Sequence, residues 1–585
     1  MALLEPSHST LPDGGQPDAG LPIAARLRGL FSTGTAGRSL TISAFIVALV
    51  ISLPALAVIS SLFDTTTASL SGLGQSVMAQ LLTNSLILAT GTLAGVLVLG
   101  VSTAWLVTMC RFPGREIFHW ALILPLAVPA YVVAYAYTDF LHHPGPVQTL
   151  LREVTGWGAQ DYWFPNIRSE GGAVFVFSFV LYPYVYLLAR ATFLEQSVCA
   201  LEAARTLGQS AWGAFWKTAL PLARPAIAAG AALAIMETLA DFGTVSHFGV
   251  RSFTTAIYQS WFSLGDRVLA GQLSAGLLGI VTLLILVERL SRSGATYEQT
   301  TTRLQRLPDY ELKGIRGALA FAACALPVTL GFLLPLGILI YLNFVGGHDL
   351  FGSRYITLTL NTFTLAGIAA VLAVALALLM AYAVRLSGSP LARLANRMTS
   401  LGYAIPGSVI AVGVLIPLAN MDNALDAWMR ATFGISTGLI LTGSIVGLVF
   451  AYIVRFMAVS INTVEASLAK VTPNMDAAAR SLGRSKLATL IEVHSPLMRG
   501  SLLTAGLIVF VDVVKELPAT LIMRPFNFDT LAIQAYRLAS DERLAEASTA
   551  SLMIVATGLL PVIILSRTIM ASRPGSKTPR QKTGK

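Results

Sequence analysis

Charged residues are scarce in this chain. Asp, Glu, Lys and Arg make up only 12% of its 585 residues, whereas 55% are hydrophobic. A soluble protein has about a quarter of its residues charged, so these few charges cannot cover a soluble surface of this size. Apolar runs of about 18 or more residues recur instead, long enough to cross a hydrocarbon core of roughly 30 Å as helices. Because the runs do not alternate between polar and apolar residues, we expect an all-α polytopic membrane protein rather than a barrel.

Cysteine is also rare, and two familiar signals are missing. The three cysteines, Cys110, Cys199 and Cys324, are scattered, which argues against a disulfide framework or a metal cluster. No G-x-x-x-x-G-K-[ST] pattern occurs, so the chain has no phosphate-cradling loop and is not expected to be an ATPase. No apolar segment with a cleavage site precedes the first long run, so we expect no cleaved signal peptide. We therefore assign no catalytic residue, no metal site and no cofactor to this chain.

The apolar runs predict about 12 transmembrane helices. Most of the Lys and Arg residues fall in every second connecting segment, beginning with the N-terminal one. By the positive-inside rule this places both termini in the cytoplasm and requires an even number of spans. The net charge of +10 is therefore explained by topology, and nucleic-acid binding is not expected. The predicted spans lie near 41–62, 82–109, 117–139, 171–193, 225–243, 268–287, 318–344, 357–384, 398–419, 437–459, 501–522 and 547–566.

The spans and the polar segments divide the chain into five parts. Two six-span halves are expected, and a small-residue run at 226–234 predicts a close helix–helix contact within the first. The parts are a disordered cytoplasmic N-terminus (1–40), the first half (41–290), a cytoplasmic linker (291–316), the second half (317–566) and a basic cytoplasmic tail (567–585).

A polar segment occurs twice, 275 residues apart. The stretch "EAARTLGQSAWGAFWKTALPLARP" aligns with "AAARSLGRSKLATLIEVHSPLMRG", and nine of the 24 positions are identical. Both copies follow the fourth span of a half. Two six-span halves insert in the same direction, so they are predicted to be parallel repeats.

Each copy predicts a pair of short cytoplasmic helices, within 195–224 and 465–499. Gly208 and Gly483 suit the left-handed position that ends a helix, and Pro221 and Pro496 mark the start of the next span. One interpretation is a solvated loop that folds back on its own bundle. Two copies at matched positions instead favour a docking surface for a partner with twofold symmetry.

The first copy resembles the "EAA" loop of permease subunits in binding-protein-dependent ABC importers. The resemblance implies that both loops are coupling helices that bind ATPase subunits. The second copy departs from the pattern, because Ala477 stands at the Glu position and Asp476 precedes it. The coupling residues it implies are Glu202, Ala203, Ala204, Arg205, Gly208 and Pro221 in the first loop, and Asp476, Ala478, Ala479, Arg480, Gly483 and Pro496 in the second.

The segments after the two loops, such as "IMETLADFGTVSHFGV" and "VFVDVVKELPATLIMRP", are similar to those of fused iron(III)-uptake permeases. This resemblance implies the type I ABC importer permease fold in a bacterial inner membrane. It also implies two partner ATPase subunits that bind ATP and Mg, and one solute-binding protein on the outer face. A permease for thiamine or an anion stays an alternative, and so does an ion-driven secondary transporter.

Two acidic residues stand out in the fifth span of each half, four in all. The 275-residue shift pairs Glu237 with Asp512 and Asp241 with Glu516, and each half places its two acids on one helix face. Ionisable residues at membrane depth usually face a bundle interior or a wet cavity, and hard cations prefer oxygen ligands. The four acids are therefore candidates for an acidic substrate pathway. Alternatively they pair with Lys515, Arg251 or Arg524, or contact the docked binding protein.

Overall fold

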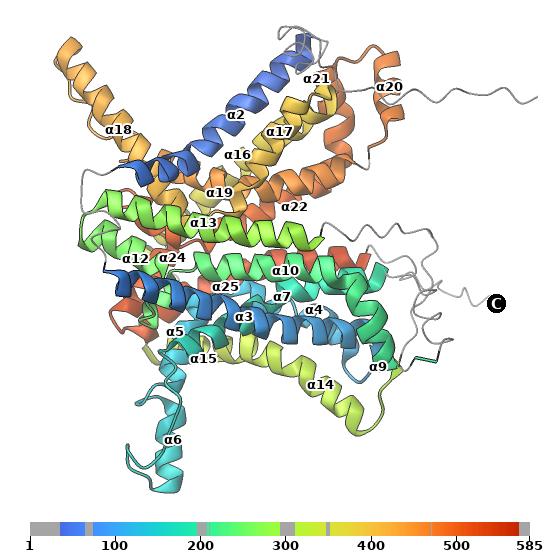
Figure 1. The fold of residues 1–585 in the computed structure, drawn as a ribbon, viewed down its shortest axis with the longest axis vertical. Coiled ribbons are helices and arrows are strands. Elements are labelled where there is room, and N and C mark those ends of the chain that lie inside the picture. The colour runs from blue at the N-terminus through green and yellow to red at the C-terminus, as the bar shows by residue number, and fades with distance from the viewer. Residues whose placement is uncertain are drawn as a thin grey trace, which may run out of the picture.

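The computed structural model describes residues 35–64, 74–195, 208–209, 211–292, 310–346, 352–469 and 471–571. These residues are almost entirely helical, as expected (Figure 1). Within them, the strands are β1 (Cys110–Arg111) and β2 (Tyr310–Glu311), which pair in parallel and fasten the end of the linker to the first half. Eleven helices are long and apolar enough to cross a membrane, or 12 if one bent pair is a single span. The predicted number of spans is confirmed.

The spans of each half follow the predicted order. Those of the first half are α2 (Thr35–Ser60), α3 (Gln75–Met109), α4 (Arg115–Ala121) with α5 (Ala130–Leu141), α7 (Glu170–Glu195), α10 (Leu220–Ala240) and α13 (Arg267–Arg292). Those of the second half are α14 (Ile315–Val328) with α15 (Leu334–Gly346), α16 (Ser353–Ser387), α17 (Pro390–Ser400) with α18 (Gly407–Phe433), α19 (Ile445–Leu468), α22 (Ser495–Val514) and α25 (Leu544–Ala571). Residues 35–40 were predicted to be disordered, but helix α2 begins at Thr35, so they are helical.

Several predicted spans are interrupted. The third is bent by 90° between α4 and α5. Pro125 lies in the 3₁₀ turn Leu124–Ala127 at this bend and Pro129 follows it, and proline cannot donate to a helix ladder. The fifth and eleventh end early, at Ala240 and Val514, and each is followed by a short helix. These are α11 (Gly243–His247) and α23 (Pro518–Met523), and further short helices are α6 (Pro146–Thr155), α12 (Phe253–Tyr258) and α24 (Leu531–Ser540).

Glycine lets the spans approach closely. A Cβ added at Gly230 of α10 would lie 2.8 Å from both the carbonyl oxygen of Tyr184 and the Cα of Val185, on α7. This confirms the close contact predicted for the small-residue run 226–234. The packing of α7 against α10 is what brings the carboxylates of α10 to the interior.

The first span of each half packs on the other half. Helix α2 packs against α16, α17 and α18, and a Cβ at Gly413 of α18 would clash with the carbonyl oxygen of Pro54 in α2. In the same way, Gly331, between α14 and α15, lies against the carbonyl oxygen of Phe179 in α7. Figure 1 shows α2 beside α16 and α17, and α14 beneath α3 and α4. The boundaries at 290 and 317 therefore divide the sequence but not the packed core.

The two hairpins lie at the same end of the spans. The second consists of α20 (Pro473–Ser481), α21 (Lys486–Thr489) and the π-helix Leu490–His494. Of the first, the structure describes Gly208, Gln209, α9 (Ala211–Ala214) and the π-helix Phe215–Ala219. Gly208 and Gly483 have φ of 81° and 74°, which confirms their predicted left-handed conformation. In Figure 1 α9, α20 and α21 all lie toward the right.

Candidate functional site

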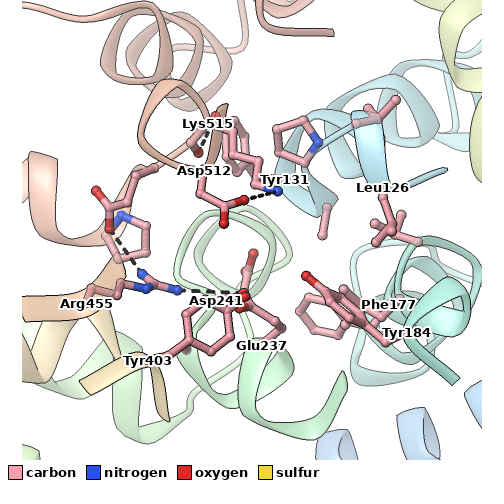
Figure 2. A pocket seen from close by; sticks show the side chains of 18 of the residues that line it. Leu126, Tyr131, Phe177, Tyr184, Glu237, Asp241, Tyr403, Arg455, Asp512 and Lys515 are labelled. Atoms are coloured by element: carbon pink, nitrogen blue, oxygen red, sulfur yellow. Dashed lines mark hydrogen bonds and ion pairs between the residues drawn. The ribbon is translucent and has the colours of Figure 1, made fainter. Parts of the chain in front are cut away.

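All four predicted carboxylates line one cavity of about 100 Å³. Glu237 lies on α10 and Asp241 directly after it, whereas Asp512 lies on α22 and Glu516 just beyond its end. Because α10 and α22 belong to different halves, the cavity lies where the two halves meet. We call this cavity the acidic chamber. Figure 2 shows Glu237, Asp241 and Asp512 around it, together with Tyr131, Tyr184 and Tyr403.

Arg455 on α19 connects the two halves inside the chamber. Its guanidinium nitrogens lie 3.6 Å from Glu237 Oε2 and 3.3 Å from Glu516 Oε1, and its side chain is only 9% exposed. The repeat does not mark Arg455, because the position 275 residues earlier is Val180. An arginine inside the otherwise apolar run "AYIVRFMAV" was the signal that could have found it.

Lys515 binds a third acid, Asp512. Its Nζ lies 2.9 Å from Asp512 Oδ1, which confirms Lys515 as one of the expected partners. Arg524 pairs with Asp529 instead. Four carboxylates thus face two cations, and the chamber keeps a net negative charge when all six groups are ionised.

Asp241 and Glu516 have a structural role that the other two acids do not share. Asp241 Oδ1 accepts a hydrogen bond from the backbone N–H of Thr244 at 2.8 Å, at the start of α11. Glu516 likewise accepts from the N–H groups of Ala519 at 2.8 Å and Thr520 at 3.0 Å, at the start of α23. A carboxylate satisfies the unpaired N–H groups at a helix N-terminus and favours its dipole. The repeat therefore preserves a helix cap as well as a charge.

A second, larger cavity adjoins the acidic chamber on the hairpin side. Its volume is about 650 Å³, and its lining reaches Glu288 and Arg289 near the end of α13 and Asn462 on α19. We call it the lower cavity. The residues that line both cavities are Leu126, Tyr184, Tyr403, Asp512 and Lys515. These shared residues separate the charged chamber from the larger lower cavity.

The other tyrosines near the chamber belong mainly to the core. Tyr182 and Tyr186 are fully buried, and Tyr135 and Tyr137 are 2% exposed. Tyr184 differs, since it lines both cavities. Within the described ranges, no group of three or more His, Cys, Asp or Glu residues could hold a metal ion.

The predicted coupling residues are described only in part. Glu202, Ala203, Ala204 and Arg205 lie outside the described residues. Pro221 and Pro496 are exposed in the first turns of α10 and α22. In α20, Ala478 is exposed and Ala479 is buried, whereas the side chain of Arg480 is not among those described. Asp476 contacts Arg385 and His494 of its own half.

Comparison with known proteins places the chain among transport proteins. Residues 97–293 match the family described as binding-protein-dependent transport system inner membrane component. The Fe(3+)-transport system permease protein FbpB 2 of Haemophilus influenzae is 27% identical over 84% of this chain and 90% of its own length. The ferric transport system permease protein FbpB of Actinobacillus pleuropneumoniae is 24% identical over 80% of this chain and 67% of its own length. The molybdenum transport system permease protein ModB of Escherichia coli is 32% identical over 26% of this chain and 62% of its own length. Over residues 97–293 the chain is thus similar to the inner-membrane components of binding-protein-dependent transport systems, and over most of its length it is similar to permeases named for ferric transport.

Proposed function

We propose that this chain is the fused, two-half permease of an ATP-driven importer of ferric iron. The observation that carries the proposal is the acidic chamber between the halves, lined by four carboxylates. Carboxylate oxygens are the ligands that hard cations prefer. Relatives named as ferric transport permeases match 77–84% of the chain, which supports the same cargo.

The assembly that fits this proposal has three kinds of partner. Two ATPase subunits, which carry ATP and Mg, would bind the two hairpins, and one solute-binding protein would deliver iron to the outer face. The chain would lie in the bacterial inner membrane with both termini in the cytoplasm. The hairpins, the linker end and the wide mouth of the lower cavity would then all face the cytoplasm.

The chamber residues suggest how a cation could pass. In the described conformation Arg455 and Lys515 neutralise part of the acidic charge, which lowers the cost of keeping four carboxylates at membrane depth. An entering cation would compete with the guanidinium and ammonium groups for Glu237 and Asp512, the two acids that do not cap a helix. Movement of the hairpins would then shift the equilibrium between outward and inward opening, with Tyr184 and Tyr403 at the boundary of the two cavities.

A second candidate function is the uptake of an anion. Arg455 and Lys515 are the observation that favours it, because an oxyanion could bind them. Permeases named for molybdenum and sulfate transport match 26% of this chain. The excess of carboxylates in the chamber opposes this reading, since like charges repel an anion.

Uptake by the reconstituted complex distinguishes the two. Vesicles containing the chain, its ATPase and its binding protein are supplied with ATP and labelled ferric iron, molybdate, sulfate or thiamine. We expect iron uptake only, and we expect the E237Q/D512N double variant to abolish it. The control variant E311Q removes an exposed carboxylate of the linker and should transport normally. Uptake of an anion without iron uptake would overturn the proposal.

A further inference from the structure

A polar cluster joins the second hairpin to the spans beneath it. Asp476 on α20 accepts hydrogen bonds from Arg385 on α16, at 2.9 and 3.2 Å. Its other carboxylate oxygen lies 2.7 Å from Nε2 of His494, directly before α22. The His494 side chain is 1% exposed, and its Nδ1 lies 2.6 Å from the hydroxyl of Tyr382 on α16. One carboxylate of the hairpin therefore contacts two membrane helices.

Arg385 adds a third helix to this cluster. It donates hydrogen bonds to the carbonyl oxygens of Leu468 and Val471, both at 2.9 Å. Leu468 ends α19, and Val471 lies in the segment that leads into α20. Hydrogen bonds between charged groups are stronger and more directional than apolar contacts. Asp476 and Arg385 therefore connect α20 to α16, α19 and α22.

The opposite face of α20 is exposed and apolar. Met475 is 40% exposed and Leu482, just beyond the helix, is 79% exposed, with Ala478 exposed between them. Residues at these spacings lie on one face of a helix. Ala479, by contrast, is 4% exposed. The hairpin thus presents Met475, Ala478 and Leu482 outward and turns Asp476 toward its own bundle.

The positions of the first half that align with this cluster carry no ionisable side chain. Asn84 and Asn361, 277 positions apart, make equivalent hydrogen bonds to the carbonyl oxygens of Arg251 and Asp529, so α3 and α16 align with this shift. With the shift of 277, Tyr382 and Arg385 correspond to Trp105 and Thr108. With the shift of 275 that aligns the hairpins, His494 corresponds to Ala219 and Asp476 to Leu201.

Aromatic packing takes the place of the polar cluster in the first half. The ring centroid of Trp105 lies 5.6 Å from that of Phe193 and 4.7 Å from that of Phe215. Tyr310 of the linker strand β2 contributes a third ring at 6.5 Å. Among the described residues, the junctions between hairpin and spans in the two halves therefore differ in chemistry.

We propose that Asp476, held by Arg385 and His494, is a positioning residue that transmits movement of the second hairpin to the spans without contacting the ATPase. This inference rests on the proposed function, because it takes the exposed face of α20 as the ATPase contact. It assigns Asp476 a role different from that of an acidic residue on the ATPase-facing surface. The second ATPase subunit would accordingly meet an apolar surface, and the charge would work inside the permease.

The test uses the complete complex in vesicles and four variants. D476N removes the charge but keeps the shape, and R385K keeps the charge but loses most of the hydrogen bonds. L482E alters the outward face, and the control E311Q removes an exposed linker carboxylate that lies outside both hairpins. Co-purification of the ATPase, ATP hydrolysis and substrate carried per ATP are measured for each.

D476N and R385K should retain the ATPase and hydrolyse ATP, but carry about tenfold less substrate per ATP, as loss of a charged hydrogen bond predicts. L482E should lose the ATPase, and E311Q should behave as the unaltered chain. If D476N releases the ATPase, or if both D476N and R385K transport normally, the inference is wrong. If D476N does not fold, the result for R385K alone decides whether the inference holds. If the unaltered complex shows no ATP-dependent uptake, the proposed function fails instead.

Discussion

At the scale of single residues, the chamber shows how one repeated charge pattern serves two purposes. Asp241 and Glu516 accept backbone N–H groups that begin α11 and α23, whereas Glu237 and Asp512 face Arg455 and Lys515. The i, i+4 spacing predicted that the acids of each pair share a face. It could not predict this division, because the capped helices form only where the spans break.

Arg455 should be indispensable to the chamber. R455M leaves Glu237 and Glu516 without their cation, and breaking a buried ion pair on one side costs about 3–5 kcal/mol. We expect a lower unfolding temperature in detergent and no uptake. R430M, which removes an exposed arginine from the outer part of α18, is the matched control. An R455M variant as stable and active as the unaltered chain would contradict the assignment.

The two classes of acid should separate experimentally. D241N/E516Q weakens two helix caps, each worth about 0.5–2 kcal/mol, so both stability and uptake should fall. E237Q/D512N should also lose uptake, because Arg455 and Lys515 each lose a carboxylate partner, but it leaves both caps in place. Amide hydrogen exchange should therefore rise in α11 and α23 of D241N/E516Q and stay unchanged there in E237Q/D512N. Equal exchange of α11 and α23 in the two double variants would argue against the division of roles.

At the scale of elements, the contact between α7 and α10 positions the chamber. Residue 230 lies against backbone atoms of α7, which cannot move aside as a flexible side chain can. The small-residue run predicted the contact correctly. It did not predict that Tyr184, beside this contact, lines both cavities, since that depends on how α7 is rotated.

Gly230 therefore offers a test of this contact. G230A inserts a methyl group 2.8 Å from two backbone atoms of α7, and overpacking typically costs about 1–3 kcal/mol. We expect lower thermal stability and reduced uptake as α7 and Tyr184 shift. G279A on α13 meets nothing within 4 Å and should have neither effect. A G230A chain indistinguishable from G279A would mean that the helices are less closely packed than described.

At the scale of the whole molecule, the large lower cavity adjoins the small acidic chamber, and contacts between the halves surround both. Arg168 and Glu542, from different halves, form an ion pair at 2.7 Å, and α2 and α14 each pack against the opposite half. These contacts interlock the two halves.

The direction of opening can be measured by labelling. Asn462 is exposed and lines the lower cavity, so N462C, with Cys199 replaced by Ser, should react with a thiol reagent from the cytoplasmic side. Trapping the ATPase with ATP and vanadate should protect it, because the hairpins then draw together. V446C, at the other end of α19 and 55% exposed, should not be protected in this way. Unchanged labelling of N462C would show that the lower cavity does not close.

The sequence by itself determined the membrane class, the number of spans, the repeat and the two glycine-ended hairpins. These features depend on local composition and periodicity, which neighbouring residues specify. Only the tertiary structure decided that Arg455 bridges acids of both halves, that the first span of each half packs on the other, and that Asp476 turns inward. Those contacts join residues far apart in the chain, and their partners are selected by the packing of whole helices rather than by any pattern along one of them.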